Sequence, residues 1–263
     1  DYDIFLKNLK NKFINKKNEI AGLIKIKKKK FQFFIDCGNP PSNNFTKNYQ
    51  AGCLAFELIS NKQKIICNSG YGKYLSSKLT LLSRSSAAHS TLYLNNTSSS
   101  IFQKNEIINK IYGNSLLQRH QIVKKTYAEE KDFYFIEASH NGYEKNFGYL
   151  HTRTIKALKK EDKIFGYDEL KKTKSYSNPL VYFIRFHIYP NIKIVKTKSG
   201  NSVLIGLPNK EGWLLQCKTN SLEIQKNIFL GNKNKIINNE SISISGSISK
   251  DLVLIEWEIE RIN

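Results

Sequence analysis

The 263-residue chain contains no methionine, not even at its first position, so an ordinary translation start is missing. We therefore expect the chain to be a piece of a longer protein, and the lack of a secretion signal then says nothing about its compartment. Long hydrophobic runs are missing too, because no apolar stretch approaches the roughly 20 residues that a transmembrane helix needs. We expect no membrane span, and periplasmic and cytoplasmic locations both stay open.

Cysteine is scarce and occurs only at positions 37, 53, 67 and 217. No Cys-x-x-Cys pair is present, and the spacing fits neither a zinc ribbon nor a thioredoxin-like motif. So few cysteines in a chain of this length do not make a disulfide scaffold either. Cys53 and Cys67 lie within or beside apolar strands, so we expect buried free thiols that pack as small hydrophobic side chains.

Acidic residues are few relative to basic ones, since 22 Asp and Glu against 42 Lys and Arg give a net charge of +20. This balance suits anionic partners such as acidic polysaccharide, nucleic acid or anionic lipid. Arginine is rare, however, while lysine, Asn and Ile are abundant, a profile that A- and T-rich codon usage would also produce. The lysine run at 27–30 has no interleaved aromatic side chains on which bases could stack. It predicts a solvated edge or turn and disfavours nucleic acid as a partner.

Hydrophobic spacing divides the chain into two parts. Residues 1–20 place Phe5, Leu6, Leu9 and Phe13 at helical spacing, which predicts a short N-terminal helix, either a linker or the remnant of a missing domain. Residues 21–263 form short alternating or β-branched runs separated by Asn, Gly, Pro and Lys, which predicts one all-β domain. The predicted strands are 32–35, 54–59, 64–67, 91–94, 134–137, 180–188, 202–207, 213–218 and 252–259.

Two segments of this β domain carry more specific signals. Residues 241–245 alternate strictly between Ser and Ile, so we expect a strand with one apolar and one wet face covering a sandwich. Residues 104–130 are ambiguous, because their apolar positions fit either a short helix or a strand pair broken at Gly113-Asn114. We interpret them as an excursion from the sheet. No repeat of 20 to 50 residues is visible, which argues against propellers and solenoids.

Polar residues gather at the ends of the apolar strands between residues 36 and 92. The segments are Asn48-Tyr49-Gln50-Ala51-Gly52, Asn68-Ser69-Gly70 and Ala88-His89-Ser90-Thr91, and two strands meet at a Ser60-Asn61-Lys62 turn. This order resembles the β-domain of the heparinase II/III-like polysaccharide lyases, in which His-x-His-Ala-Asp, Asp-x-Gly and Ala-His-Asn-Thr surround a metal ion. The resemblance implies that His89 lies beside Gln50 and Asn68 at a shared cavity.

The metal ligands of that family are only partly present here. His89 is a good zinc ligand, whereas Gln50 and Asn68 carry neutral amides, which are weak donors to zinc. These amides can instead form a hydrogen-bond network with His89. We therefore expect no bound metal and no other cofactor, with zinc at these three positions as the alternative.

A second matching stretch supplies the candidate chemistry. The segments Ala138-Ser139-His140-Asn141-Gly142-Tyr143, His151-Thr152-Arg153 and Gly166-Tyr167-Asp168 resemble the family's Ala-x-His-Asp-Gly-Tyr, His-x-Arg and Gly-x-Asp series, apart from Asn141. The resemblance implies catalytic roles for His140 and Tyr143 and substrate-binding roles for Arg84 and Arg153, because a cation that neutralises a uronate carboxylate acidifies the adjacent C–H. The same residues also fit a structural interpretation, in which His140 and His151 orient turns and Arg153 pairs with Asp168.

The third match is Arg185-Phe186-His187-Ile188-Tyr189-Pro190, which resembles the family's Arg-Phe-His-Leu-His-Pro strand. Strand geometry puts Arg185, His187 and Tyr189 on one face. Such a face fits either a groove, with His187 binding substrate as the resemblance implies, or a buried and fully hydrogen-bonded cluster, which we favour. The segments Gly212-Trp213 and Val253-Leu254-Ile255-Glu256-Trp257 match the family's last strands and predict core positions.

Together the matches imply an antiparallel β-supersandwich that, in complete family members, follows an (α/α) toroid. The activity implied is β-elimination at a uronic acid of an anionic polysaccharide, with the toroid as a partner in the same protein. On this interpretation the chain alone is inactive. Two alternatives from other classes stay open: a catalytically degenerate sandwich that binds anionic glycan or scaffolds a partner, and a nucleic-acid binder driven by charge, whose affinity would fall steeply with salt.

Overall fold

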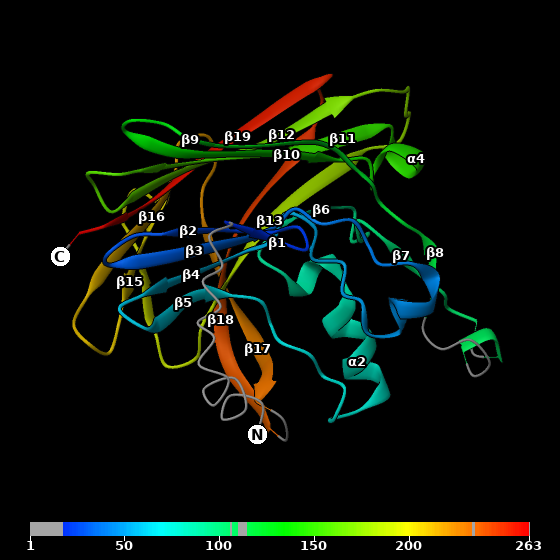
Figure 1. The fold of residues 1–263 in the computed structure, drawn as a ribbon, viewed down its shortest axis with the longest axis horizontal. Helices are drawn as coiled ribbons and strands as arrows, with labels where there is room; N and C mark the ends of the chain where they lie inside the picture. Colours follow the sequence, from blue (N-terminus) through cyan, green and yellow to red (C-terminus); the bar gives the residue numbers. More distant parts are fainter. Residues whose placement is uncertain (1–17, 106, 110–114, 233–234, 263) are drawn as a thin grey trace, which may run out of the picture.

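Two antiparallel β-sheets stack to form the molecule (Figure 1), whose computed structural model describes residues 18–105, 107–109, 115–232 and 235–262. The lower sheet has the order β1 (Glu19–Ile20), β2 (Leu23–Lys27), β3 (Phe31–Asp36), β4 (Phe56–Ser60), β5 (Gln63–Cys67), β13 (Leu180–Ile188), β18 (Lys235–Ile248), β17 (Glu223–Asn232), with β6 (Leu92–Leu94) paired to β13. The upper sheet has the order β14 (Lys193–Lys196), β15 (Ser202–Gly206), β16 (Gly212–Cys217), β19 (Leu252–Arg261), β12 (Lys163–Lys172), β11 (Tyr149–Leu158), β10 (Phe133–His140), β9 (Ile122–Glu129). The predicted antiparallel sandwich is confirmed.

The short elements lie at one end of the sandwich (Figure 1). They are the 3-10 helices η1 (Asn43–Asn48) and η2 (Ser86–Ala88), the helices α2 (Ser77–Arg84) and α4 (Glu144–Phe147), and the strand pair β7 (Ile101–Phe102) and β8 (Leu116–Gln118). Ser76 caps α2, because its side chain accepts a hydrogen bond from the backbone N–H of Leu79. The predicted strand at residues 134–137 belongs to β10, and the ambiguous region at 104–130 contains β8 and β9.

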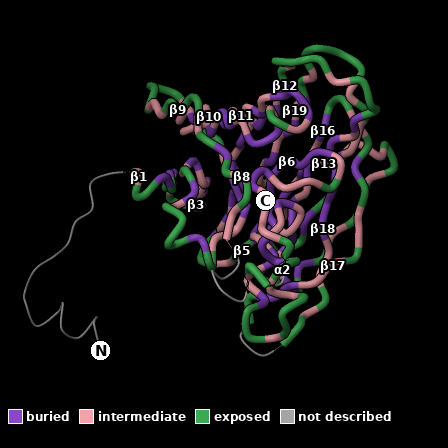
Figure 2. Tube along the Cα trace, turned by 90° about the vertical axis from the view of Figure 1, so that its right-hand side faces the viewer, coloured by how far each residue is buried: buried purple, intermediate pink, exposed green. Residues whose placement is uncertain are grey.

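Aromatic side chains from both sheets meet in the core, which Figure 2 shows as buried strands facing each other. The ring of Phe56 stacks on Phe33 with centroids 4.9 Å apart and on Trp257 of the upper sheet at 5.4 Å. Gly166 lies opposite Trp257 in the strand register, and a Cβ at this glycine would come 2.1 Å from the indole ring. The indole therefore occupies the space that any larger residue at 166 would need.

The hairpin between β4 and β5 turns at Asn61 and Lys62, as predicted. Both residues have left-handed backbone angles, with φ of 43° and 69°. Two consecutive residues with positive φ are typical of the type I′ turn, whose twist matches that of the flanking strands, and asparagine tolerates this region well. The lysine run at 27–30 also lies at a turn, between β2 and β3, where Lys28 pairs with Asp162 at 3.2 Å.

Three details differ from the sequence-based expectations or lie beyond them. The predicted N-terminal helix falls largely on residues 1–17, outside the described residues, and Glu19 already belongs to strand β1. The serine face of residues 241–245 is not wet, because Ser241 and Ser243 are 1% and 2% exposed. These serines lie opposite His187 and Arg185, whose side chains bond to the loop at Ala87, so this loop covers their face.

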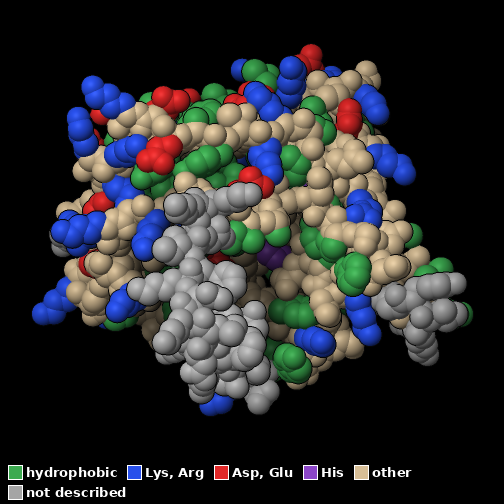
Figure 3. Space-filling model, viewed as in Figure 1, with side chains coloured by type: hydrophobic (Ala, Val, Ile, Leu, Met, Phe, Trp, Pro, Cys, Tyr) green, Lys and Arg blue, Asp and Glu red, His purple; other side chains and the backbone are tan. Residues whose placement is uncertain are grey.

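The surface carries mixed charge. Figure 3 shows Lys and Arg side chains spread around one face with Asp and Glu between them, and a hollow with a histidine at its base. Within the part of the chain that the structure describes, no helix is both long and apolar enough to span a membrane. All four cysteines are buried free thiols, as expected.

Candidate functional site

His89, Gln50 and Asn68 line one pocket on the outer face of the lower sheet. Its volume is about 720 Å³. Strand alternation explains the position of its wall, because residues such as Phe34 and Glu57 alternate with the buried core residues of β3 and β4. The charged residues that line the pocket are Asp36, Glu57 and Lys64. The predicted convergence of the three polar residues is therefore present.

The hydrogen bonds of His89 define its protonation. Its Nδ1 lies 2.8 Å from the carbonyl oxygen of Ser85, which can only accept, so Nδ1 carries the proton and donates it. The other nitrogen, Nε2, lies 3.1 Å from Oε1 of the Gln50 side chain. Burial lowers the pKa of His89 to about 4, against a smaller opposing effect of the Ser85 bond. The imidazole is therefore neutral at pH 7, and its Nε2 carries a lone pair. Two acceptors cannot bond to each other, so the Gln50 amide must turn over to present its NH2 group to Nε2.

The second amide, Asn68, also takes part in a network. Its Oδ1 accepts from the backbone N–H of Ser90 at 3.0 Å, and its Nδ2 lies 3.5 Å from Glu57. Glu57 in turn forms a 3.0 Å ion pair with Lys64. Asp36 has a pKa raised to about 6, because burial outweighs the hydrogen bond from the Gly38 N–H. The pocket thus holds two carboxyl groups and one cation.

These residues do not fit a transition metal. Zinc prefers imidazole, thiolate and carboxylate ligands, and within the described residues no three such groups converge to hold an ion. The Nε2 of His89 faces Gln50, and the Oδ1 of Asn68 is already bonded to a backbone N–H. Gln50 is therefore engaged with His89, whereas Asn68 is engaged with Ser90 and Glu57, so only one of the two amides bonds directly to the imidazole.

A buried ion pair in the upper sheet reaches the loops that carry this pocket. Arg153 on β11 donates from Nε and Nη2 to the carboxylate of Asp168 on β12, at 2.8 and 2.9 Å. Its Nη1 crosses the interior and donates to the carbonyl oxygens of Leu54 and Ser90, at 2.8 and 3.0 Å. Ser90 follows His89 directly, so Arg153 fixes the backbone at the candidate site. The pairing proposed as the structural interpretation of Arg153 is present.

His140 and His151 form a chain of hydrogen bonds behind this ion pair. The N–H of Gly142 donates to Nδ1 of His140, whose Nε2 donates to Nδ1 of His151 at 3.1 Å. His151 then donates from Nε2 to Asp168 at 2.7 Å. Burial, and then the neighbouring His151, holds the pKa of His140 well below its usual range. Both rings are therefore neutral, and every ring nitrogen has a partner.

The remaining candidate residues are buried and do not line the pocket. None of the Tyr143 side chain is exposed, and its hydroxyl donates to the carbonyl of Leu92 at 2.9 Å. Arg84 is buried under the η1 loop, where it donates to the carbonyls of Tyr49 and Thr46. His187 is buried, donates to the carbonyl of Ala87 at 3.0 Å and lies 3.0 Å from Ser69. Arg185 and Tyr189 on the same face are only half-buried, and the Arg185 Nε lacks a partner among the described residues, so the fully hydrogen-bonded cluster expected there forms only in part. The catalytic roles of His140 and Tyr143 and the substrate contacts of Arg84, Arg153 and His187 stay predictions.

Sequence patterns missed several residues around this site. His120 is buried, with Nδ1 2.9 Å from the Ser100 hydroxyl and Nε2 3.3 Å from the Gly38 carbonyl, and no motif marks it. Asp36, Glu57 and Lys64 were also missed. Strand alternation could have found Glu57, since it lies between the inward-facing Phe56 and Leu58 and must point outward.

Comparison with known proteins extends this description. The model of the family "Heparinase II/III-like, C-terminal" matches residues 16–258. The FtsZ-localized protein C of Caulobacter vibrioides is 26% identical over 204 residues, which cover 73% of this chain and 34% of that protein. The heparan sulfate lyase HepC of Pedobacter heparinus superposes with a TM-score of 0.74 at 14% identity, covering 98% of this chain and 38% of the lyase.

A heparinase III structure has the same fold, with a TM-score of 0.67 at 15% identity over 92% of this chain and 35% of that enzyme. The chain thus spans about a third of the length of each of these proteins. The likeness to the solved structures establishes the fold, and the family match covers nearly the whole chain. The chain belongs to the heparinase II/III-like C-terminal domain family.

Proposed function

We propose that this chain is the β-sandwich portion of a polysaccharide lyase that acts by β-elimination on glycans containing uronic acid. Family membership supports the reaction class. The observation that carries the proposal for this chain is the pocket in which His89 presents an unprotonated Nε2 beside Gln50 and Asn68. In β-elimination a base removes the C5 proton of a uronate whose carboxylate is neutralised, and the electron pair of the C5–H bond forms a C4=C5 double bond. The C4–O4 bond breaks, and the leaving oxygen takes up a proton from a general acid.

In this proposal His89 is the group of this chain that contacts the glycan. Its Nε2 is free of a proton at neutral pH, because burial depresses its pKa, so it can accept a proton or a hydrogen bond once Gln50 swings aside. The other candidate residues receive positioning roles in this proposal, in place of the catalytic and substrate-binding roles expected from the sequence. Their bonds end on the backbone around the pocket or on one another, as seen for Arg153, His140, Tyr143, Arg84 and His187. In this proposal an (α/α) toroid of the same protein supplies the other wall of the cleft and the remaining proton-transfer groups.

The test uses the full-length protein that contains this chain. Incubation with uronate polysaccharides is expected to release an unsaturated product that absorbs ultraviolet light. His89→Ala should lower kcat by about 100-fold, the usual contribution of a positioned acid–base group. Tyr143→Phe, which removes a buried hydroxyl bonded to the Leu92 carbonyl, should change stability more than rate. Full activity in His89→Ala would contradict the catalytic role of His89. Loss of activity in Tyr143→Phe without loss of stability would contradict the positioning role of Tyr143.

One observation favours a second function, an anionic-glycan-binding or scaffolding domain without turnover. Gln50 and Asn68 replace a metal-binding histidine and carboxylate of the family, and both are engaged in hydrogen bonds. The two functions differ in one measurement. A lyase shortens the polysaccharide and generates absorbance, whereas a degenerate binder retards the same polysaccharide in a gel and leaves its length unchanged.

A further inference from the structure

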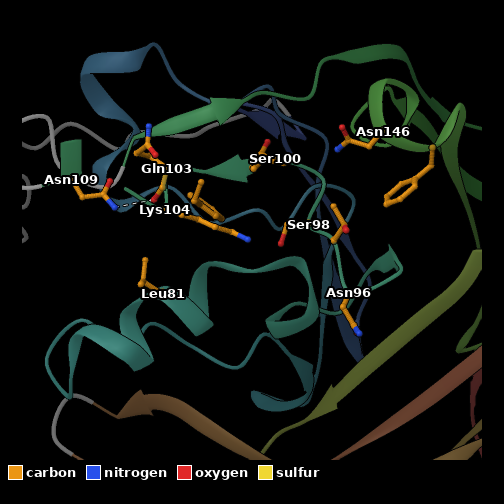
Figure 4. A pocket seen from close by; sticks show the side chains of 12 residues that line it. Leu81, Asn96, Ser98, Ser100, Gln103, Lys104, Asn109 and Asn146 are labelled. Atoms are coloured by element: carbon orange, nitrogen blue, oxygen red, sulfur yellow. Dashed lines mark hydrogen bonds between the residues drawn. The ribbon is translucent and has the colours of Figure 1, made fainter. Parts of the chain in front are cut away.

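A second pocket lies on the other side of the segment that carries His89. It has a volume of about 760 Å³ and opens between α2, the strand β7 with its preceding loop, and α4 (Figure 4). Two contacts join it to the first site. Ser86 donates its backbone N–H to the hydroxyl of Ser98 in the pocket wall, and the Arg84 guanidinium lies 4.2 Å from the centroid of the Phe102 ring. The segment from Arg84 to His89 therefore connects the first pocket, which His89 lines, to Ser98 and Phe102 in the wall of the second.

The chemistry of the second pocket differs from that of the first. Amides and hydroxyls supply most of its polar lining, together with the cation of Lys104, and no Asp or Glu lies among its described lining residues. Figure 4 shows the Lys104 side chain extending into the pocket toward Ser98. In the first pocket, by contrast, Asp36 and Glu57 face a single Lys64. The second lining therefore attracts an anionic group more strongly than the first, where the Lys64 cation is already paired with Glu57.

The polar groups of this pocket include several that are available to a ligand. Among the described residues, the side-chain amides of Asn96 and Asn146 make no hydrogen bond, and the buried Oδ1 of Asn109 lacks a donor. The wall itself is fixed, because Asn109 donates from Nδ2 to the carbonyl of Gln103 at 2.9 Å. A buried acceptor without a donor is costly, and a ligand hydroxyl would satisfy it.

We propose that this second pocket binds one acidic sugar unit of the glycan. The carboxylate of the sugar pairs with Lys104, its hydroxyls bond to the amides of Asn96, Asn146 and Asn109, and its apolar ring face packs on Leu81 and Phe102. The inference rests on the proposed function for the identity of the glycan. It adds that this chain binds a further acidic unit here, beside the reacting unit at His89, so that a bound glycan passes over the Arg84–His89 segment.

The test is a titration of this chain with a glucuronate-containing disaccharide, followed by NMR of the asparagine side-chain amides. Binding should shift the signals of Asn96 and Asn146, and a neutral glucose disaccharide should bind about tenfold more weakly because it lacks the charge-assisted bond. Lys104→Gln should lower the affinity for the acidic disaccharide by about tenfold. Lys78→Gln on the exposed side of α2 should leave this affinity unchanged.

A second matched pair tests the apolar contact. Leu81 lines the pocket and is 46% exposed, and the neighbouring Leu82 is 52% exposed and does not line it. Leu81→Ala should weaken binding several-fold and Leu82→Ala should not. Equal effects in either pair, or unchanged amide signals at saturating sugar, would overturn the inference. If the full-length protein bound the sugar in this pocket but released no unsaturated product, the proposed lyase activity would be refuted. The assignment of this pocket as a binding site for an acidic sugar would still hold.

Discussion

The guanidinium of Arg153 and the carboxylate of Asp168 form a doubly hydrogen-bonded ion pair with no exposed surface on either residue. Burial opposes ionisation of Asp168, but Arg153 and His151 outweigh it and hold the pKa of this carboxyl well below its usual range. The Trp257 indole donates a further bond at 2.8 Å. One carboxylate thus joins β11, β12 and β19, and Arg153 links these strands to the loops at the candidate site.

Asp168→Asn should destabilise the protein strongly. The substitution preserves volume but leaves the buried Arg153 charge without its counterion, a change that costs about 3–5 kcal/mol. The free energy of unfolding in denaturant measures this loss. Asp132→Asn is the control, because its 3.4 Å pair with Lys160 is exposed and worth less than about 1 kcal/mol. Similar losses in both variants would show that the buried pair is not a principal support of the fold.

Stability should fall as the pH drops from about 6.5 to 4. Burial lowers the pKa values of His89 and His120 to about 4 and that of His187 to about 3, from 6.5. In this window the unfolded chain binds protons that the folded chain excludes, so unfolding becomes easier by up to about 1.4 kcal/mol per pH unit for each histidine. Asp36, with its pKa raised to about 6, acts in the opposite direction and offsets one of them.

Denaturant unfolding at pH 7, 5.5 and 4.5 measures this dependence. The stabilising effect of the neutral histidines is complete above pH 6.5 and declines below it. His187→Gln should make the curve flatter, because one of the titrating groups is removed. A free energy of unfolding that stays constant or rises toward pH 4.5 is incompatible with buried neutral imidazoles.

The pair of substitutions Gln50→His and Asn68→Asp should create zinc affinity. It places a second imidazole and a carboxylate around His89, which makes the three-ligand set that zinc prefers. Competition with a chromophoric chelator measures the affinity. The unchanged chain and each single variant should bind at least tenfold more weakly, and adding His89→Ala to the pair should abolish the gain. Zinc binding by the unchanged chain would show that the amides do not replace the metal.

Gly52→Ala should disturb His89. A Cβ at Gly52 would come 2.7 Å from Cδ2 of the imidazole, closer than packed atoms approach, so the ring must move off its bonds to Ser85 and Gln50. We expect a loss of about 1–3 kcal/mol and a shifted His89 signal in NMR. Gly206→Ala is the matched control, since the nearest atom to its Cβ would lie 3.8 Å away. A Gly52→Ala variant as stable as this control would mean that the ring has room to move.

Strand positions were predictable because burial and strand periodicity are local properties. Residues 180–188 form β13 with the predicted bounds, and Asn61 and Lys62 turn as expected. The covered serine face of β18 was not predictable, because the loop that covers it comes from residues far away in sequence. The convergence of His89, Gln50 and Asn68 in one pocket was predicted from the family resemblance and not from local patterns. The isolated His120 carried no pattern, and its partners Ser100 and Gly38 are defined only by the folded chain.

Every histidine of this protein is enclosed in the folded interior, and the most accessible, His89, is only 3% exposed. An acylating reagent such as diethyl pyrocarbonate therefore modifies almost no histidine of the native molecule, whatever it does to exposed lysines. The slow rate of histidine acylation therefore measures the rate at which the sandwich opens, and His89 is expected to be the first histidine labelled.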